Sequence, residues 1–435
     1  MKKKNIRRRQ GVFAILILSA ALFISSPTGA CLAADDDPSM RAVPVERQTT
    51  QGSTNRTPHF ALIKEHADPG IPPDVWVPGE LLTQMNVPIK LNAVKTSFTL
   101  RGIKPSETLG APVLKTLSPN VIDLEFKARS EDNRQYFNLS GLERITGVSY
   151  SLSQDGVLIV GASAAMTSYP EIKWEKYALP ELEKPFNLVW DHVLGDNADL
   201  SEEDALPSVS VISPTWFSLL DETGRTSNRG DVSYAAAAHA KGYRVWGLVS
   251  NGFKRGMTSK FLADKKAQDL FIANMLSYAA IYGLDGINID FESVHNDDAS
   301  RLTEFVRRFA AAGRTMGLAF SMDVMIPTKW SLCYQRKALS EIVDYIAVMT
   351  YDEHWRTSPK AGSTASLPWV GAALDGTLAQ VPADKLLMGI PFYTREWRET
   401  RGKNGKTSLK SLALSMASVD ERIASSGAQK KWLEP

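Results

Sequence analysis

The stretch YGLDGINIDFESVHND, residues Tyr282 to Asp297, alternates apolar side chains with acids and an amide directly after an Asp-Gly pair. One parity holds the apolar residues Ile287, Ile289 and Phe291, and the other holds Asn288, Asp290 and Glu292. Side chains of a β-strand alternate between its two faces, so this pattern predicts a strand with one apolar and one acidic face. An amphipathic surface strand would alternate in the same way, but this polar face contains no Lys, Ser or Thr.

The sequence on both sides of this stretch predicts an α/β fold. From about Pro185 onward, short apolar runs alternate with helical patterns. The predicted strands cover residues 186–190, 208–213, 244–251, 285–292, 316–324, 343–352 and 385–393. Such alternation is typical of a parallel sheet covered by helices. Seven strands without a glycine-rich phosphate turn favour a (β/α)8 TIM-type barrel over residues 184–435. No eighth strand is recognised before Pro435, so we expect either a missed strand or a barrel that lacks its last strand.

The N-terminus has the three-part layout of a secretory signal. A basic run, MKKKNIRRRQ, precedes an apolar run that is too short to span a membrane comfortably, and small residues follow it. We therefore predict a signal peptide over residues 1–34 and a location outside the cell or in the cell envelope. A lipoprotein anchored at Cys31 is the less favoured alternative, because Thr28 stands where an aliphatic residue is preferred.

Between the signal and the barrel, the sequence predicts two further segments. Residues 35–80 are rich in polar residues and proline near their start and are expected to be a linker. Residues 81–170 contain short β-type runs, and the last two flank Asp155 and Gly156, a strong hairpin turn signal. We predict a small β-rich accessory module here, which would either bind a glycan or space the barrel.

Composition narrows the function classes. Lys plus Arg number 50 against 48 for Asp plus Glu, so no electrostatic argument supports nucleic-acid binding. The two cysteines, Cys31 and Cys333, provide neither a disulfide framework nor a metal–thiolate site once the signal is removed. The chain carries no HExxH, GxSxG or EF-hand motif, and we expect no metal and no cofactor.

In a barrel, the acidic face of the opening stretch points inward. Asn288, Asp290 and Glu292 would then lie in one row, with Glu292 last, at the C-terminal rim where barrel active sites lie. Two acids in a partly desolvated mouth repel each other, so the pKa of one should rise, as a general acid requires. A structural row of carboxylates, or a divalent-metal site, is the alternative.

The same residues resemble a known family. DGINIDFE is similar to the DGxDxDxE signature of glycoside hydrolase family 18, the chitinase-like hydrolases. MTYD, residues Met349 to Asp352, follows two strands later, where that family carries its MxYD motif, and GIPFY follows on the next strand. The resemblance covers about Phe186 to Trp397 and implies a barrel that hydrolyses N-acetylated amino-sugar polymers.

The resemblance also implies roles for individual residues. Glu292 would be the general acid, Asp290 would orient and stabilise the 2-acetamido group of the substrate, and Tyr351 would donate a hydrogen bond to its carbonyl. That acetamido group would act as the nucleophile. The substrate-binding residues implied are Asp285, Asn288, Met349, Asp352, Tyr393 and Trp397. For Tyr393 and Trp397, a buried structural aromatic is an equally good interpretation.

Asn288 departs from the signature, because chitinases usually have Asp at this position. Its amide, together with SPTWF (residues 213–217) and VSNGF (residues 249–253), is similar to the bacterial cell-wall and spore-cortex lytic N-acetylglucosaminidases. The resemblance therefore implies cleavage of β-1,4 bonds next to N-acetylglucosamine in peptidoglycan, with cell-wall association and no stable protein partner. A chitinase acting on chitin oligomers, or a lectin-like relative that only binds glycans, is the alternative.

Overall fold

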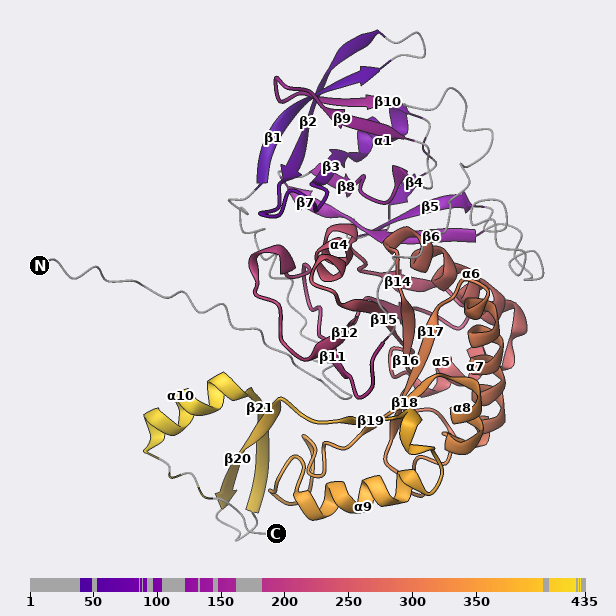
Figure 1. Ribbon diagram of the computed structural model, residues 1–435, viewed down its shortest axis with the longest axis vertical. Helices are drawn as coiled ribbons and strands as arrows, with labels where there is room; N and C mark the ends of the chain where they lie inside the picture. The colour runs from indigo at the N-terminus through magenta and orange to yellow at the C-terminus, as the bar shows by residue number, and fades with distance from the viewer. Residues whose placement is uncertain are drawn as a thin grey trace, which may run out of the picture.

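In the computed structural model, a β-rich N-terminal module packs against an α/β domain (Figure 1). The structure describes residues 40–48, 53–85, 87, 89–91, 97–103, 122–131, 134–143, 148–161, 182–401, 407–427, 429 and 431. The predicted signal peptide, residues 1–34, lies outside the described residues. Among the described helices, none has the length and apolar character needed to cross a membrane.

The N-terminal module contains a seven-stranded sheet in the order β7-β8-β3-β2-β1-β10-β9 and a three-stranded sheet in the order β4-β5-β6. Its elements are β1 (Met40–Gln48), β2 (Thr54–Lys64), β3 (Asp74–Pro78), α1 (Gly79–Gln84), β4 (Ile89–Leu91), β5 (Ser97–Ile103), β6 (Ile122–Lys127), β7 (Arg129–Glu131), β8 (Arg134–Asn138), β9 (Ser149–Leu152) and β10 (Leu158–Gly161). The predicted β-rich module is therefore present, and β9 and β10 pair as the expected antiparallel hairpin.

The prediction that residues 35–80 form a linker is wrong for the described part of that segment. Residues 40–48, 54–64 and 74–78, inside the predicted linker of residues 35–80, form three neighbouring strands of the module sheet. The polar composition near the start of the segment was misleading, because β1 buries few side chains and the buried apolar residues of β2 and β3 come later, at Ala61, Leu62, Ile63, Val75 and Val77. Val43 and Val45 of β1 are buried while most of their neighbours face solvent. Cross-strand pairing, rather than a continuous apolar pattern, holds this segment in the sheet.

The α/β domain is built on seven parallel strands, and all seven predicted strands are confirmed. They are β11 (Asn187–Asp191), β12 (Val209–Pro214), β15 (Arg244–Ser250), β16 (Gly286–Asp290), β17 (Ala319–Met325), β18 (Tyr345–Met349) and β19 (Leu386–Gly389). They are hydrogen-bonded in this order, and the short hairpin β13 (Phe217–Leu219) and β14 (Thr226–Asn228) joins at β15. Within the described residues, the sheet is a partial TIM barrel whose outer strands are β11 and β19.

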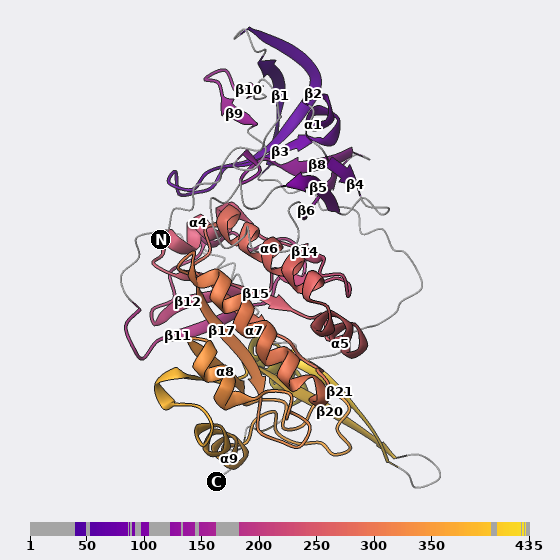
Figure 2. The same cartoon turned by 90° about the vertical axis from the view of Figure 1, so that its right-hand side faces the viewer.

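Helices cover the outer face of this sheet (Figure 2). They are α4 (Val232–Ala240), α5 (Arg255–Ala263), α6 (Lys265–Tyr282), α7 (Ala299–Arg314), α8 (Arg336–Ile342) and α9 (Leu367–Leu378), with short 3-10 turns η2 (Leu200–Glu202), η3 (Asn296–Asp298) and η4 (Ala383–Lys385). The ring of Phe291 stacks on Phe305 of α7 at 5.5 Å and meets Phe271 of α6 edge-on at 6.0 Å. The apolar parity of the opening stretch therefore packs on the helices, as predicted.

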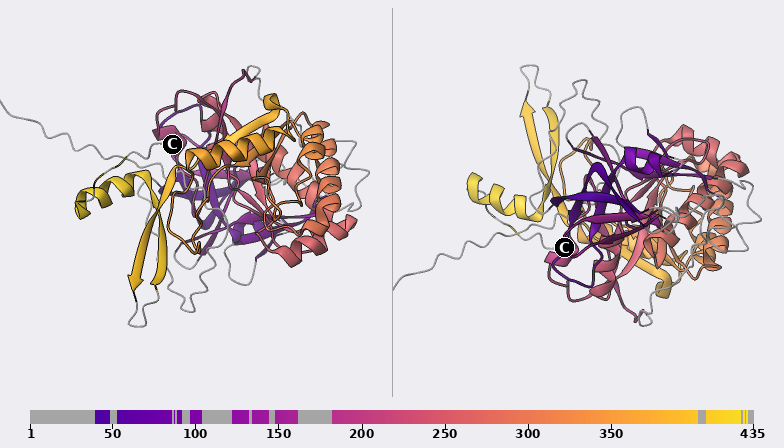
Figure 3. Two further views of the ribbon diagram at one scale, coloured as in Figure 1. Left: turned by 90° about the horizontal axis from the view of Figure 1, so that it is seen from below. Right: turned by 90° about the horizontal axis from the view of Figure 1, so that it is seen from above.

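The C-terminal part adds elements that the sequence did not predict. β20 (Tyr393–Arg401) and β21 (Thr407–Ser415) pair as an antiparallel hairpin, and α10 (Met416–Ser426) follows it. The hairpin and α10 project from the body of the domain (Figure 3). Only the start of β20, at Tyr393, is buried against the barrel.

The module docks on the α/β domain through two sets of contacts. In the first, the backbone N–H of Glu125 donates to the hydroxyl of Tyr278 at 2.9 Å, and that hydroxyl donates to the carbonyl of Glu125 at 3.1 Å. The side-chain amide of Asn228 donates to the same carbonyl at 3.0 Å. The edge of Phe126 packs on Tyr278 with 6.1 Å between the ring centroids. Strand β6 is thereby joined to α6 and β14.

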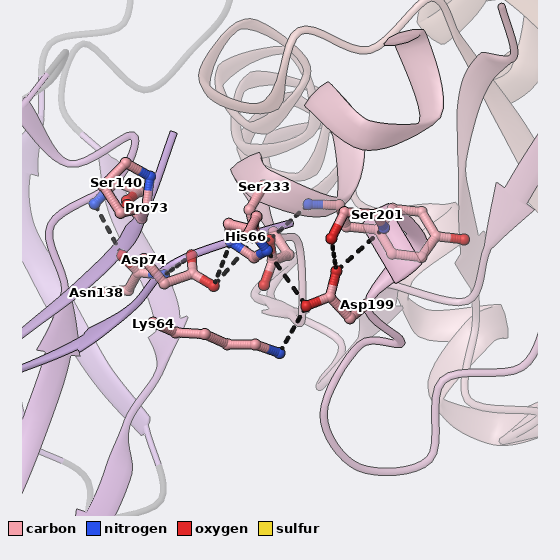
Figure 4. Close-up of polar contacts among 11 residues, drawn as sticks. Lys64, His66, Pro73, Asp74, Asn138, Ser140, Asp199, Ser201 and Ser233 are labelled. Atoms are coloured by element: carbon pink, nitrogen blue, oxygen red, sulfur yellow. Dashed lines mark hydrogen bonds and ion pairs between the residues drawn. The ribbon is translucent and has the colours of Figure 1, made fainter. Parts of the chain in front are cut away.

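The second set of contacts centres on His66, which the module inserts between two carboxylates (Figure 4). Nε2 of His66 lies 3.4 Å from Oδ2 of Asp74, and Nδ1 lies 3.3 Å from Oδ2 of Asp199 in the α/β domain. Lys64 also reaches Asp199, at 3.0 Å. The contact with Asp74 raises the pKa of His66, against the opposing effect of burial. Although burial acts to raise it, hydrogen bonds from Ser201 and Lys64 lower the pKa of Asp199 to about 2.

This cluster predicts a pH-dependent stability. Because the folded-state pKa of His66 is raised, its contribution is fully present below the unfolded-state pKa and is lost as pH rises through the folded-state pKa. Asp199 stays ionised over that window. Between about pH 6.5 and about pH 8.5, the Tm of the wild type should fall by about 2–4 °C more than that of His66→Asn. Differential scanning calorimetry of both proteins over this range is the measurement.

The comparison with His66→Asn controls for the titration of other groups, because those groups are present in both proteins. Burial raises the pKa of the neighbouring carboxyl of Asp231 to about 6, so its titration falls mainly below this window, and it is present in both proteins. Parallel Tm curves for the wild type and His66→Asn would contradict the charged role of His66.

Candidate active site

The polar face of β16 points into the barrel, as predicted, and Asn288 connects four strands there. Its Oδ1 accepts hydrogen bonds from Nε1 of Trp190 at 2.8 Å and from the hydroxyl of Ser213 at 3.2 Å. Its Nδ2 donates to the hydroxyl of Ser321 at 2.9 Å and to Oδ1 of Asp323 at 2.8 Å. These four bonds use the whole capacity of the amide, so Asn288 holds β11, β12, β16 and β17 together inside the barrel.

Asp290 and Glu292 lie beyond Asn288, toward the C-terminal end of the strand. Oδ1 of Asp290 is buried and has no hydrogen-bond partner within the described part of the chain. Burial raises the pKa of Asp290 to about 7. Burial, followed by the charges of Asp290, Asp323 and Asp352, raises the pKa of Glu292 well above its usual range. The expected upward shift of the pKa is therefore found at Glu292, which is 3% exposed.

The backbone around Glu292 is held by two buried side chains that the sequence did not single out. Oδ1 of Asn251, which follows β15, accepts from the N–H of Glu292 at 3.0 Å, and its Nδ2 donates to the carbonyl of Glu292 at 2.7 Å. The hydroxyl of Tyr334 donates to the carbonyl of Phe291 at 2.8 Å. Ser293 then adopts a φ of 55°, a left-handed conformation that such contacts must maintain. These contacts fix the backbone at Glu292 and therefore the position of its Cα and Cβ atoms.

A second group of predicted residues lies at the end of β18, two strands away. Met349, Tyr351 and Tyr393 form a small buried cluster. Oδ1 of Asp352 accepts from the hydroxyl of Tyr393 at 2.6 Å and from Nη2 of Arg395 at 3.1 Å. Asp352 has a φ of 59°, so backbone strain recurs at this second strand end.

Tyr351 belongs to the same electrostatic environment as the acids of β16 and β17. Burial, followed by the charges of Asp323, Glu292 and Asp290, raises the pKa of Tyr351 well above its usual range. Its phenol therefore stays protonated at neutral pH and can donate a hydrogen bond. Parallel strands β16, β17 and β18 lie side by side (Figure 1), so their carboxyl ends bring these groups to one rim.

One predicted site residue, Asp285, is not brought to this rim. Asp285 precedes β16, at the end opposite Glu292, and its Oδ2 lies 2.8 Å from Nε2 of His239 and 2.9 Å from the N–H of Val245. A Cβ on the next residue, Gly286, would approach Cδ1 of Trp246 to 2.7 Å, which explains the Asp-Gly pair structurally.

Trp397 is half-buried on β20. Its Nε1 donates to the carbonyl of Gly362 at 3.0 Å. No hydrogen bond to the acids is recorded for its side chain among the described residues.

Asp323 is the site residue that the sequence analysis missed. It is 3% exposed on β17 and accepts from Asn288 and, through Oδ2, from Nε1 of Trp190 at 3.1 Å. The signal that could have revealed it is a lone acid in the otherwise apolar run AFSMDVM. A charged residue inside a buried parallel strand requires partners, and these come from β11 and β16.

The arrangement combines a buried carboxyl of raised pKa at the rim, Glu292, with further acids behind it. Such a site can donate a proton to a leaving group and stabilise positive charge that develops nearby. Among the described residues, no group of three or more His, Cys, Asp and Glu side chains has a geometry that could hold a metal ion.

Comparison with known proteins identifies the family. The family model described as glycosyl hydrolases family 18 matches residues 236–434. This part of the chain is similar to glycosyl hydrolase family 18. The match includes the signature on β16 and the MTYD motif after β18, and the predicted resemblance is confirmed.

Individual relatives of the chain include proteins described as bacterial glycosylases and lytic enzymes. An uncharacterized glycosylase of Bacillus subtilis, YvbX, is 29% identical over 39% of this chain and 52% of its own length. The cortical fragment-lytic enzyme of Bacillus anthracis is 31% identical over 34% of this chain and 36% of its own length. The spore cortex-lytic enzyme SleL of Bacillus cereus has a TM-score of 0.45 and 25% identity, over 51% of each chain. The chain thus spans about half, or less, of the length of these relatives.

Proposed function

We propose that this protein is a glycoside hydrolase and that Glu292 is its general acid. The observation that carries the proposal is the buried Glu292 carboxyl, whose pKa burial and neighbouring charges raise, at the C-terminal rim of a family-18 barrel. A carboxyl that keeps its proton at neutral pH can protonate the oxygen of a glycosidic bond as that bond breaks. A purely structural carboxylate would gain from ionic or hydrogen-bond partners instead.

The chemistry that fits these residues uses the acetamido group of the substrate. The acetamido oxygen attacks the anomeric carbon, the C–O bond to the leaving sugar breaks, and Glu292 transfers its proton to the departing oxygen. The hydroxyl of Tyr351 donates to the acetamido carbonyl, and Asp290 faces the positive charge of the oxazolinium ion. Water, deprotonated by the Glu292 carboxylate, then opens this ion with net retention of configuration. Family 18 is an exception to the usual two-carboxylate mechanism.

We infer that the substrate is peptidoglycan, cleaved on the reducing side of N-acetylglucosamine. The support is the amide at Asn288 and the similarity to enzymes described as cortical fragment-lytic. A substrate in the cell wall places the action of the enzyme outside the membrane. Chitin oligomers share the acetamido group and are the second candidate, since a Drosophila melanogaster protein described as a probable chitinase is 28% identical over 38% of this chain.

Product analysis tests this proposal. The purified chain is incubated with peptidoglycan and, separately, with chitin oligomers, and new reducing ends are counted and identified by mass spectrometry. We expect muropeptide fragments that end in N-acetylglucosamine, formed faster than any products from chitin. Cleavage of chitin alone would move the assignment to a chitinase. Binding of peptidoglycan by the folded chain without release of any fragment would contradict the enzymatic proposal and favour a lectin-like function.

A further inference from the structure

Backbone pairing between β15 and β16 stops short of Glu292. The last pair in register is Ser250 opposite Asp290. Beyond it, the side chain of Asn251 takes the place of a strand: its Oδ1 accepts from the N–H of Glu292 at 3.0 Å, and its Nδ2 donates to the carbonyl of Glu292 at 2.7 Å. A side-chain amide offers the same donor and acceptor as a peptide group, so Asn251 extends the hydrogen-bonded ladder by one step.

The amide of Asn251 has no hydrogen-bonding capacity left for a substrate. Its Oδ1 also accepts from the N–H of Phe253 at 3.2 Å, and its Nδ2 also donates to the hydroxyl oxygen of Thr258 on α5 at 2.8 Å. With two bonds accepted and two donated, all four positions of the amide are used inside the protein. The residue is 0% exposed. Asn251 therefore acts on a substrate only through the backbone that it holds, which includes that of Glu292.

Directly after Glu292, the chain enters a conformation that costs free energy. Ser293 has a φ of 55°, in the left-handed region that residues other than glycine rarely adopt. Asn251 holds the carbonyl of Glu292, which precedes this torsion angle. Nε of Arg255, at the start of α5, donates to the carbonyl of Ser293, which follows it, at 3.1 Å. Two side chains of the segment after β15 therefore hold the strained link from both ends.

A change in this torsion angle would move Glu292, because the chain is fixed on both sides of it. Before it, the hydroxyl of Tyr334 donates to the carbonyl of Phe291 at 2.8 Å. After it, Oδ1 of Asn296 accepts from the N–H of Cys333 at 2.9 Å. Since the segment after β17 holds both flanks, relaxation of the angle has to be absorbed by the residues between them.

Building on the function proposed above, we propose that Asn251 is a positioning residue: together with Arg255 it maintains the left-handed turn after Glu292 and so aims the Glu292 carboxyl at the bond to be cleaved. Proton transfer requires the acid within hydrogen-bond reach of the leaving oxygen. A displaced Glu292 therefore lowers kcat, while the contacts that bind the glycan are unchanged and KM stays the same.

A double-mutant cycle tests the inference. Asn251→Ala is made in the wild type and in Ser293→Gly, because glycine adopts positive φ without steric cost and does not need the turn to be held. We expect Asn251→Ala in the wild type to lower kcat roughly 10–100-fold at constant KM. In the Ser293→Gly background, the loss caused by Asn251→Ala should be roughly 3–10-fold smaller. An equal loss in both backgrounds, or full kcat in folded Asn251→Ala, overturns the inference.

The matched control is Asn274→Ala, which truncates another buried amide, on α6. It should lower the Tm and leave kcat unchanged. A loss of kcat as large as that of Asn251→Ala would assign both losses to general destabilisation and overturn the inference. If Asn251→Ala does not fold, Arg255→Met removes the bond to Ser293 from an exposed side chain. A fall in kcat of roughly 2–5-fold at constant KM then supports the inference, and full kcat overturns it.

A readout without turnover separates this inference from the proposed function. Because Asn251 accepts from the N–H of Glu292, hydrogen exchange of that amide, measured by NMR on the full chain, should be faster in Asn251→Ala. Unchanged exchange in the folded variant overturns the inference in an active or an inactive protein. A wild type that cleaves no amino-sugar polymer overturns the proposed function, while the exchange measurement still decides whether Asn251 holds this backbone.

Discussion

Replacing Glu292 with Gln is expected to lower kcat on the cleaved polymer by roughly 10²–10⁴-fold while leaving glycan binding intact. Burial and the neighbouring charges raise the pKa of Glu292 and so favour its neutral form, and Gln reproduces the shape and charge of that form. Asn251 hydrogen-bonds to the backbone N–H and carbonyl of residue 292, so these two bonds are retained in the variant. Gln cannot release a proton, and only the transition state is affected. Reducing-end kinetics and a binding isotherm for the same polymer are the two measurements.

The matched control is Glu304→Gln, the same chemical change on the exposed face of α7. It should leave kcat unchanged. In the wild type, activity should fall as pH rises through the pKa of Glu292, because the proton is then lost. Full turnover by folded Glu292→Gln would remove Glu292 from the mechanism, and an equal loss in both variants would indicate a nonspecific effect.

Replacing Asp290 with Asn is expected to lower kcat by roughly 10²–10³-fold and, at high pH, to stabilise the fold. The activity falls because the developing oxazolinium cation loses a facing negative charge. The stability rises because ionising a buried carboxyl without a partner for Oδ1 is costly.

The raised pKa of Asp290 determines at which pH the Asn variant is the more stable protein. Burial raises the pKa of Asp290 to about 7, so the wild type loses stability as pH rises from its unfolded-state pKa through about 7. The variant lacks this loss, and its advantage in urea unfolding should be larger at about pH 8 than at about pH 5. The control is Asp375→Asn, an exposed position on α9. A variant that is less stable than the wild type at both pH values would contradict the buried-charge argument.

The fold of the barrel could be predicted because the sequence pattern of each strand is visible within a few neighbouring residues. The period-two pattern of Ile287, Ile289 and Phe291 requires an apolar layer on one side, and the helices supply it through Phe271 and Phe305. The seven strands were recognised for the same reason, since strands buried on both faces form apolar runs bounded by turn residues. The position of Glu292 at the rim follows directly from the direction of β16.

The N-terminal strands and the β20–β21 hairpin could not be predicted in this way. Strand β1 buries few side chains, and the residues of β20 after Tyr393 are half-buried or exposed, so neither strand shows an uninterrupted apolar pattern. Their conformation depends on hydrogen bonds to a partner strand, which are a property of the pair and not of one segment.

By itself, the sequence determined which side chains face into the barrel and which acid lies at its rim, because alternation along a strand is a local property. Only the tertiary structure decided what those side chains meet. The pairing of β17 with β16 brings Asp323 to Asn288, β11 carries Trp190 to Asn288, and the end of β15 carries Asn251 to Glu292. Register and strand order are set by packing over the whole sheet, and the protonation of the acids follows from the burial that this packing creates.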